Sequence, residues 1–429
     1  MPDFDSVIRH ADNHPFLGII DGKIAALAGE GSGREEIDAT GHLLMPGVID
    51  SHVHFNEPGR TDWEGFHTGS RAAAAGGVTT FFDMPLNSNP PTVTVEAFRE
   101  KAALGREKSI TDFGLWGGLI PGYLDHLEPV WQAGVIGFKA FMSGSGIDEF
   151  PKSDATTLRE GMRRLAPLGA LVAVHAELDE KNTSAGVSIA DFLASRPISS
   201  EVAAIHLACE LAGETGAKLH IVHVSSVAGL EEVLAAKSRG VDVTCETCPH
   251  YLVLTSEDVE RLGAVAKCAP PIRSREERDA LLGRVKLGQV QTIGSDHSPA
   301  PPAMKVNDNF FKIWGGIAGI QHLLPLLLET GLSVEMIGQL TRTHVARRFG
   351  LPTKNGLQVG QDADFSLVKK QARKEILQKD LHYRHPQSPY VGLFVHHEVA
   401  HTFLRGRSIY AQGVFPRQHG GQLLIPHRD

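Results

Sequence analysis

The sequence predicts an α/β protein: a (β/α)8 TIM-type barrel with a small β-sandwich domain formed by both chain termini. Two observations lead to this prediction. Between residues 47 and 352, eight short apolar segments alternate with longer segments of helical spacing, and both chain ends are strand-like and rich in turns. Eight strands that alternate with helices favour a parallel sheet closed into a barrel. A doubly wound open sheet has the same alternation, and the strand count does not exclude it.

The first 46 residues predict the N-terminal part of the small β domain. Apolar runs at 17–20 and 24–27 flank Asp21-Gly22, a dipeptide typical of hairpin turns. Strand-like segments return near the other end of the chain, at 365–368, 398–404 and 408–411. Because these late strands lack helices to cover them, we expect residues 353–429 to combine with residues 1–46 in one domain.

The barrel domain is predicted at residues 47–352. Its strands are apolar runs bounded by turn residues, at 48–55, 78–85, 113–119, 136–142, 171–177, 219–226, 243–251 and 291–299. Between them, apolar residues recur three or four positions apart, which predicts helices at 94–108, 155–165, 201–215, 230–239 and 275–282.

Composition and charge argue against several classes of protein. The formal net charge of −8 gives no general basic surface, so we expect neither a nucleic-acid partner nor binding to an anionic membrane. No apolar run is long enough to span a bilayer, and the acidic N-terminus lacks the basic-then-apolar layout of a signal peptide. The sequence therefore predicts a cytoplasmic protein that acts on a small molecule.

The four cysteines are interpreted as buried, reduced thiols. Cys245 and Cys248 form a Cys-x-x-Cys pair, but Cys209 and Cys268 are single, and a zinc ribbon needs a second pair. The pair also lies within a predicted strand that runs to Tyr251, whereas a thioredoxin-like pair opens a helix.

Polar residues gather where the predicted barrel strands end. His52 and His54 are two apart, so in a strand their side chains leave the same face. A solvated strand end could carry such a pair alone, but five strands of a barrel bring their ends to one face. The set is His52, His54, Lys139, His175, His223 and Asp296. Imidazole and carboxylate ligands suit zinc or a similar divalent ion.

Lys139 is the least expected member of this set, because residues 136–142 are otherwise apolar and should be buried. Burial favours the neutral amine of a lysine. A neutral amine can capture carbon dioxide as a carbamate, whose two oxygens could bridge two metal ions. The alternative is a lysine that extends its ammonium group to water.

With these residues the chain resembles the cyclic amidohydrolases of the amidohydrolase superfamily, a group that contains hydantoinases, dihydroorotases and allantoinases. The resemblance implies two divalent ions, most often zinc, with manganese, cobalt or iron as alternatives. It implies that His52 and His54 bind the first ion, His175 and His223 the second, and that Lys139 bridges them as N6-carboxylysine. Asp296, in Gly-Ser-Asp-His-Ser-Pro, would bind the first ion and act as the catalytic base in hydrolysis of a ring C–N bond by metal-activated hydroxide. The resemblance also implies a homotetramer.

His220 is excluded from this set. It lies three residues from His223, so in a strand its side chain faces the other way.

Two positions bear on which ring is opened. Dihydroorotases carry His-x-His-x-Arg, whose arginine binds a substrate carboxylate, and this chain has Asn56 there. Hydantoinases place a tyrosine five residues after the bridging lysine, and this chain has Gly144. Four blocks resemble the allantoinases instead, at 56–61, 83–91, 143–150 and 314–319.

That resemblance implies allantoin, a neutral hydantoin of purine catabolism, as the substrate and allantoate as the product. Asn89 and Ser298 are candidate substrate contacts, and each is also a common turn residue. A hydantoinase, a dihydropyrimidinase or a dihydroorotase of altered specificity remains an alternative. A non-catalytic scaffold is a further alternative, although such relatives typically lose several metal ligands.

Overall fold

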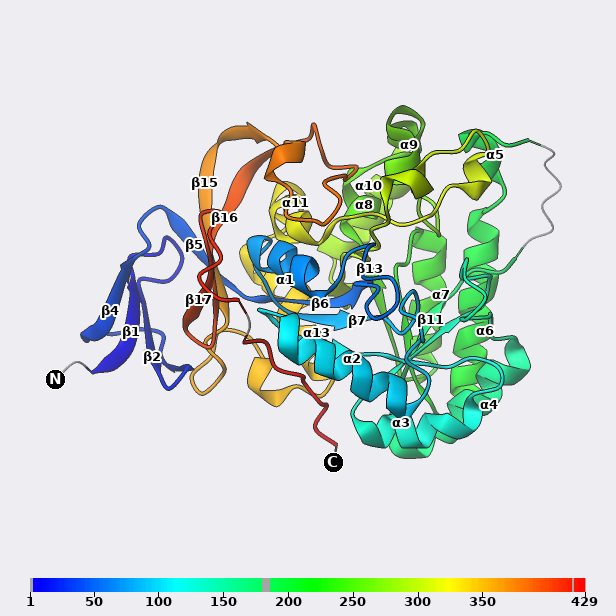
Figure 1. Cartoon of the computed structure of the whole chain (residues 1–429), viewed down its shortest axis with the longest axis horizontal. Helices are drawn as coiled ribbons and strands as arrows, with labels where there is room; N and C mark the ends of the chain where they lie inside the picture. The colour runs from blue at the N-terminus through cyan, green and yellow to red at the C-terminus, as the bar shows by residue number, and fades with distance from the viewer. Residues whose placement is uncertain (1–2, 180–185, 419, 429) are drawn as a thin grey trace.

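The computed structural model describes residues 3–179, 186–418 and 420–428. Its larger part is a barrel of parallel strands surrounded by helices, and its smaller part is a pair of β-sheets beside it (Figure 1). In order, the barrel strands are β6 (Val48–Val53), β7 (Val78–Asp83), β8 (Asp112–Leu115) continued by β9 (Gly117–Gly118), β10 (Phe138–Phe141), β11 (Leu171–His175), β12 (Lys218–Ile221), β13 (Val243–Thr247) and β14 (Thr292–Ile293). Neighbouring strands pair in parallel from β6 to β8 and from β9 to β14.

Two links close the barrel. Trp116 separates β8 from β9, and its backbone N–H donates to Asp83 of β7 while Gly117 N–H donates to Gly137 ahead of β10. After β14, His297 forms a parallel bridge to Val53 at the end of β6. The predicted (β/α)8 barrel is thereby confirmed, and an open sheet is excluded.

Several of the helices that cover the barrel begin at a side chain that caps free N–H groups of the first turn. Thr94, Asp154, Ser226 and Ser274 each accept a hydrogen bond from the backbone three residues later. The α-helices that follow the strands are α1 (Phe66–Ala75), α2 (Val95–Lys108), α3 (Leu127–Ala133), α4 (Ala155–Leu165), α5 (Ile189–Ala194), α6 (Ile198–Thr215), α7 (Val227–Ser238), α8 (Pro249–Val253), α9 (Ser256–Leu262), α10 (Arg275–Lys286), α11 (Leu323–Glu329), α12 (Val334–Gly338) and α13 (His344–Arg348).

Several predicted strands were longer than the observed ones, most of all the strand at 291–299, because β14 spans only Thr292–Ile293. The strand predicted at 243–251 ends early for a specific reason. The sequence predicts extended backbone at 243–251, but β13 ends at Thr247 and α8 begins at Pro249. Proline favours the first turn of a helix, because its ring fixes φ and that position needs no N–H donor. Cys248 therefore lies between a strand and a helix, and all four cysteines are buried and free, as predicted.

Both chain ends build the small β-sandwich. The first sheet has the order β3-β2-β1-β4 and consists of β1 (Phe4–Arg9), β2 (Phe16–Ile20), β3 (Lys23–Ala26) and β4 (Gly33–Asp38). The second has the order β17-β16-β15-β5 and consists of β5 (His42–Pro46), β15 (Phe365–Glu375), β16 (Phe394–Leu404) and β17 (Arg407–Ala411). One apolar cluster joins both sheets and includes Ile8, Leu17, Ile24, Leu44, Phe365 and Phe403. The domain limits at residues 47 and 352 stay a prediction.

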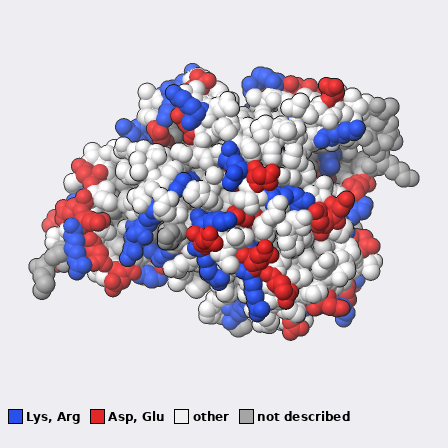
Figure 2. Space-filling view, in the orientation of Figure 1, with Lys and Arg blue, Asp and Glu red and all other residues white. Residues whose placement is uncertain are grey.

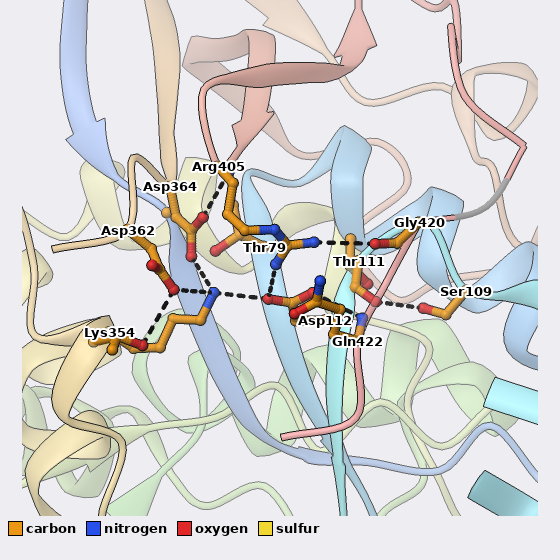
Figure 3. Close-up of polar contacts among 12 residues, drawn as sticks. Thr79, Ser109, Thr111, Asp112, Lys354, Asp362, Asp364, Arg405, Gly420 and Gln422 are labelled. Atoms are coloured by element: carbon orange, nitrogen blue, oxygen red, sulfur yellow. Dashed lines mark hydrogen bonds and ion pairs between the residues drawn. The ribbon is translucent and has the colours of Figure 1, made fainter. Parts of the chain in front are cut away.

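A buried ionic cluster fastens the small domain to the barrel at the N-terminal end of the strands (Figure 3). Asp112, the first residue of β8, accepts hydrogen bonds from Lys354 Nζ at 2.7 Å, Arg405 Nη1 at 2.5 Å and the backbone N–H of Gln422 at 2.9 Å. Lys354 Nζ also lies 2.7 Å from Asp364, which precedes β15. The chain's last described residues run back along the barrel, where Leu423 bridges to Phe113.

Charges of both signs are mixed on one face of the molecule. On the face drawn in Figure 2, the described Lys and Arg side chains stand among Asp and Glu side chains. Within the described part of the chain, no helix has the length and apolar character needed to cross a bilayer.

Candidate metal centre

His52 and His54 extend from the end of β6 toward one carboxylate. The Nε2 atom of His52 lies 3.2 Å from Asp296 Oδ1, and the Nε2 atom of His54 lies 3.4 Å from the same oxygen. One ligand atom from each of the three residues lies within 4.8 Å of the others, which is the spacing of a metal-binding group. This is the only such group of histidine, cysteine or acidic side chains among the described residues.

The backbone beyond β14 aims Asp296 at this point. Asp296 has φ 47°, a left-handed conformation that costs free energy in a non-glycine residue and that recurs at functional sites. The flanking residue His297 accepts the N–H of His54 at 2.7 Å, which ties this loop to β6. Burial raises the pKa of Asp296, but His52, His54 and His223 outweigh it and hold that pKa well below the usual value, so the carboxylate is ionised.

His175 and His223 form a second pair beside the first. Nδ1 of His175 lies 2.9 Å from Nε2 of His223, and the ring of His223 lies 5.4 Å from that of His52. His223 also has a left-handed backbone, with φ 41°, because it follows the end of β12 rather than continuing it. Burial, His175 and Lys139 hold the pKa of His223 well below its usual value, so its imidazole is neutral, the form that binds metals.

Lys139 lies in β10 with its side chain fully buried. Its Nζ has no hydrogen-bond partner among the described residues and lies 4.8 Å from the centre of the Phe141 ring. Burial lowers the pKa of Lys139 to about 8, although Asp296 and Glu246 oppose the shift.

These residues fit a metal centre. Buried polar atoms are nearly always hydrogen-bonded, yet Lys139 Nζ and His223 Nδ1 have no such partner in the described structure. Metal ligands are the other common partners of buried imidazoles, and the surrounding donors are nitrogen and carboxylate oxygen. The six predicted ligand residues are thus brought together at the C-terminal ends of five barrel strands, the face where barrel enzymes place their active sites.

Glu246 was missed by the sequence reasoning. It is fully buried in β13, where its Oε1 lies 2.8 Å from Nδ1 of His52 and its Oε2 accepts a hydrogen bond from Ser51 at 2.5 Å. Burial raises the pKa of Glu246, but His220 and His52 outweigh it and hold that pKa below the usual value. The carboxylate therefore directs Nε2 of His52 toward Asp296. The sequence signal for it was its position near the end of a predicted strand, where it adjoins Cys245 of the Cys-x-x-Cys pair.

His220, which was excluded from the ligand set, has a partner away from that set. Its Nδ1 lies 2.8 Å from the Thr244 hydroxyl on the next strand.

A cavity of about 340 Å³ lies over the metal-binding residues. Ser298 lines it, as do Asn87, Gly144, Trp314 and Gly316, along with the four histidines and Asp296. Asn89 is exposed and does not line this cavity, whereas Asn87, two residues earlier, is buried against it. The left-handed backbone of Asn87, with φ 68°, accounts for the different directions of the two side chains.

The pattern of the Amidohydrolase family matches residues 43–409. An allantoinase of Solibacter usitatus is 51% identical over 424 residues, which is 96% of this chain and 93% of that protein. An allantoinase of Rubrobacter xylanophilus is 48% identical over 99% of this chain and 97% of its own length. Among solved structures, the L-hydantoinase (dihydropyrimidinase) of Arthrobacter aurescens has a TM-score of 0.94 and 32% identity, covering 98% of this chain and all of that one.

Proposed function

The chain belongs to the amidohydrolase family, and from that premise we propose that it is an allantoinase, which opens the hydantoin ring of allantoin by hydrolysis to give allantoate. The observation that carries the proposal is the 51% identity to an allantoinase over nearly the full length of both chains. The hydantoinases of similar structure are more distant, at 32% identity for the one from Arthrobacter aurescens.

Two features of the site favour a neutral ring. Asn56 is buried with φ 65°, and its Nδ2 donates to the Pro299 carbonyl at 3.4 Å. Asparagine tolerates this left-handed backbone better than arginine does, so the residue that would bind a substrate carboxylate is disfavoured here. At Gly144, a Cβ would meet no atom within 4 Å, so the absence of a tyrosine leaves room for the ureido arm of allantoin.

In this proposal, His52, His54 and Asp296 would hold one divalent ion, and His175 and His223 would hold the other. Lys139, as its carbamate, would complete the ligand set. Two bound ions, zinc or alternatively manganese, cobalt or iron, supply Lewis acidity and lower the pKa of water.

Lys139 forms its carbamate from the neutral amine. With a pKa of about 8, about a tenth of the side chain is neutral at pH 7. The amine nitrogen bonds to the carbon of CO2 and loses one proton to solvent, which leaves a group with one negative charge and two oxygens. The carbamate would replace a costly buried ammonium by an anionic group whose oxygens can bind a metal ion.

Asp296 moves the proton of the reaction. As an ionised carboxylate it accepts a proton from the attacking water, while the water oxygen bonds to the ring carbonyl carbon. When the ring C–N bond breaks, Asp296 returns that proton to the departing nitrogen. Ser298 lies in the cavity wall as a candidate partner for the ring, and Asn87 is better placed than Asn89 to contact it.

The two alternatives have different consequences. A hydantoinase, dihydropyrimidinase or dihydroorotase-like enzyme would have the same fold, and two hydantoinases of solved structure share it with TM-scores of 0.94 and 0.90. A scaffold protein would not need all six ligands, which this chain retains.

Substrate profiling of the metal-loaded protein, with bicarbonate present, tests the proposal. We expect allantoin to be opened with a kcat/KM at least about tenfold above those for hydantoin, dihydrouracil and dihydroorotate. A preference for hydantoin or dihydrouracil would replace the proposal by its nearer alternative. Fewer than one bound ion per chain and no hydrolysis of any ring would support the scaffold.

A homotetrameric assembly and a cytoplasmic location stay predictions. Light scattering on the purified protein tests the first, and cell fractionation tests the second.

A further inference from the structure

One wall of the cavity is a segment with little regular structure. Residues 310–316, here called the wall segment, follow the loop after β14 and contain only the short 3-10 turn η5 (Phe310–Lys312). A segment without strand or helix neighbours leaves its carbonyl groups in need of donors. Five of these seven carbonyls, those of Phe310, Phe311, Ile313, Trp314 and Gly316, accept hydrogen bonds from two lysine side chains.

Lys267 binds the first part of the wall segment. Its Nζ donates to the carbonyls of Phe310 at 2.7 Å, Phe311 at 3.1 Å and Ile313 at 2.5 Å. The ammonium group also lies 4.8 Å from the ring of Phe192, on α5. The side chain is 5% exposed, and all three donors of the ammonium group are in use.

Lys305 binds the second part in the same way. Its Nζ donates to Trp314 at 2.9 Å and Gly316 at 2.7 Å, and to Ala264 outside the wall segment at 3.3 Å. This side chain is 9% exposed. The two lysines thus divide the wall segment between them, and neither forms an ion pair with a carboxylate among the described residues.

We propose that Lys267 and Lys305 are positioning residues that hold the wall segment over the metal centre and thereby set the affinity for the cyclic substrate. Neither side chain is assigned to the chemistry, since their donors are bound to backbone carbonyls. A buried ammonium group is costly, and burial lowers the pKa of Lys267 to about 8 and that of Lys305 to about 7. Each ammonium group therefore depends on carbonyl acceptors that are held in place. The wall segment depends on the two lysines in turn, because among the described residues few other groups donate hydrogen bonds to its carbonyls.

Backbone contacts connect the wall segment to the substrate side of the cavity. The N–H of Gly316 donates to the Lys267 carbonyl at 2.7 Å, and the N–H of Trp314 donates to Met304 at 3.0 Å. Gly316 has φ 133°, and a Cβ there would lie 2.3 Å from the Ser298 carbonyl oxygen. Because the wall segment touches the backbone of Ser298 so closely, its displacement changes the shape of the cavity beside Asp296 without moving the histidines on the strands.

The test compares Lys305→Met and Lys267→Met with Lys237→Met, which alters an exposed lysine on α7. Methionine keeps most of the length of the side chain and removes all three donors. We expect KM to rise about tenfold in each wall variant while kcat changes less than about threefold, since binding rather than chemistry is affected. Hydrogen exchange at Trp314 and Gly316 should accelerate in the wall variants and not in the control.

The substrate named in this inference rests on the proposed function. Hydrogen exchange needs no substrate, so it tests the role of the two lysines even if the proposed function is wrong. If allantoin is not the substrate, KM is measured with whichever cyclic amide the protein opens. Lys305→Gln, which keeps two donors, serves if a methionine variant does not fold. Its KM should rise less than about tenfold and still exceed that of the native protein, and exchange at Trp314 and Gly316 should be faster than in the native protein. Unchanged KM and exchange in the wall variants would overturn the inference. So would exchange that accelerates equally throughout the barrel, because the lysines would then stabilise the whole fold.

Discussion

At the metal centre, the backbone conformation of single residues sets the direction of their side chains. His223 and Asp296 both have positive φ values, of 41° and 47°, and lie two and three residues after the ends of β12 and β14. An extended continuation of β12 or β14 would send these side chains elsewhere. The local strain is held by the parallel bridge from His297 to Val53 and by the buried Glu246 contact to His52. Rigid support of this kind keeps ligand atoms in place before a metal ion binds.

Lys139→Ala tests the proposed carbamate at the residue scale. The substitution removes the only side chain expected to contact both metal ions. We therefore expect activity to fall by more than about 100-fold, a larger loss than removal of a group that only contacts a metal ligand would cause. A short carboxylic acid such as acetate or propionate should restore part of the activity, because the cavity left by the lysine can hold its carboxylate. Initial rates with and without the added acid provide the measurement. Full activity of the Lys139→Ala variant without added acid would show that Lys139 is not a metal ligand.

At the scale of elements, the molecule has a catalytic end and a fastening end. The strands present the candidate ligands at their C-terminal ends, while the opposite end carries the cluster around Asp112, Lys354 and Asp364 (Figure 3). Arg342 is fully buried there, and its guanidinium donates to Asp364 at 3.0 Å and to the Gly47 carbonyl at 2.7 Å. These contacts join β8, the start of β6 and the strand β15 of the small domain.

Asp112→Asn should therefore lower stability and leave catalysis intact. The amide keeps the shape but leaves Lys354 and Arg405 without a full counter-charge, which costs about 3 kcal/mol when a buried pair is broken. Urea-induced unfolding measures the loss, and kcat/KM under native conditions should stay unchanged. Asp125→Asn is the matched control, since its exposed pair with Arg164 should contribute little. A drop in kcat/KM in folded Asp112→Asn protein would contradict the separation of the two ends.

For the whole molecule, the proposed centre connects strands that are far apart in the sequence. Its ligands come from β6, β10 and β11 and from the segments after β12 and β14. A metal ion that binds only the folded protein stabilises all of these strands together.

Removal of metal with a chelator should lower the melting temperature and abolish activity. At a free metal concentration 100 times the dissociation constant, one bound ion contributes about 2.7 kcal/mol. Thermal unfolding before and after chelation measures the effect, and return of metal should reverse it. The double variant His52→Ala/His54→Ala lacks the imidazole ligands of one site and should respond less to the chelator. An equal response in the native protein and this variant would place the stabilising ion elsewhere.

The amino-acid sequence by itself determined the barrel, the two-ended small domain and the six candidate ligands. These follow from local features: apolar runs with a period of two or of 3.6 residues, and polar residues where those runs stop. The tertiary structure decided what depends on long-range contact. It replaced the end of a predicted strand by α8, showed that Asn87 rather than Asn89 reaches the cavity, and placed Glu246 behind His52. It also brought Lys267 and Lys305 to the carbonyls of the wall segment, up to 46 residues away along the chain. Such contacts have no period or motif in the sequence, because they exist only after the barrel has closed.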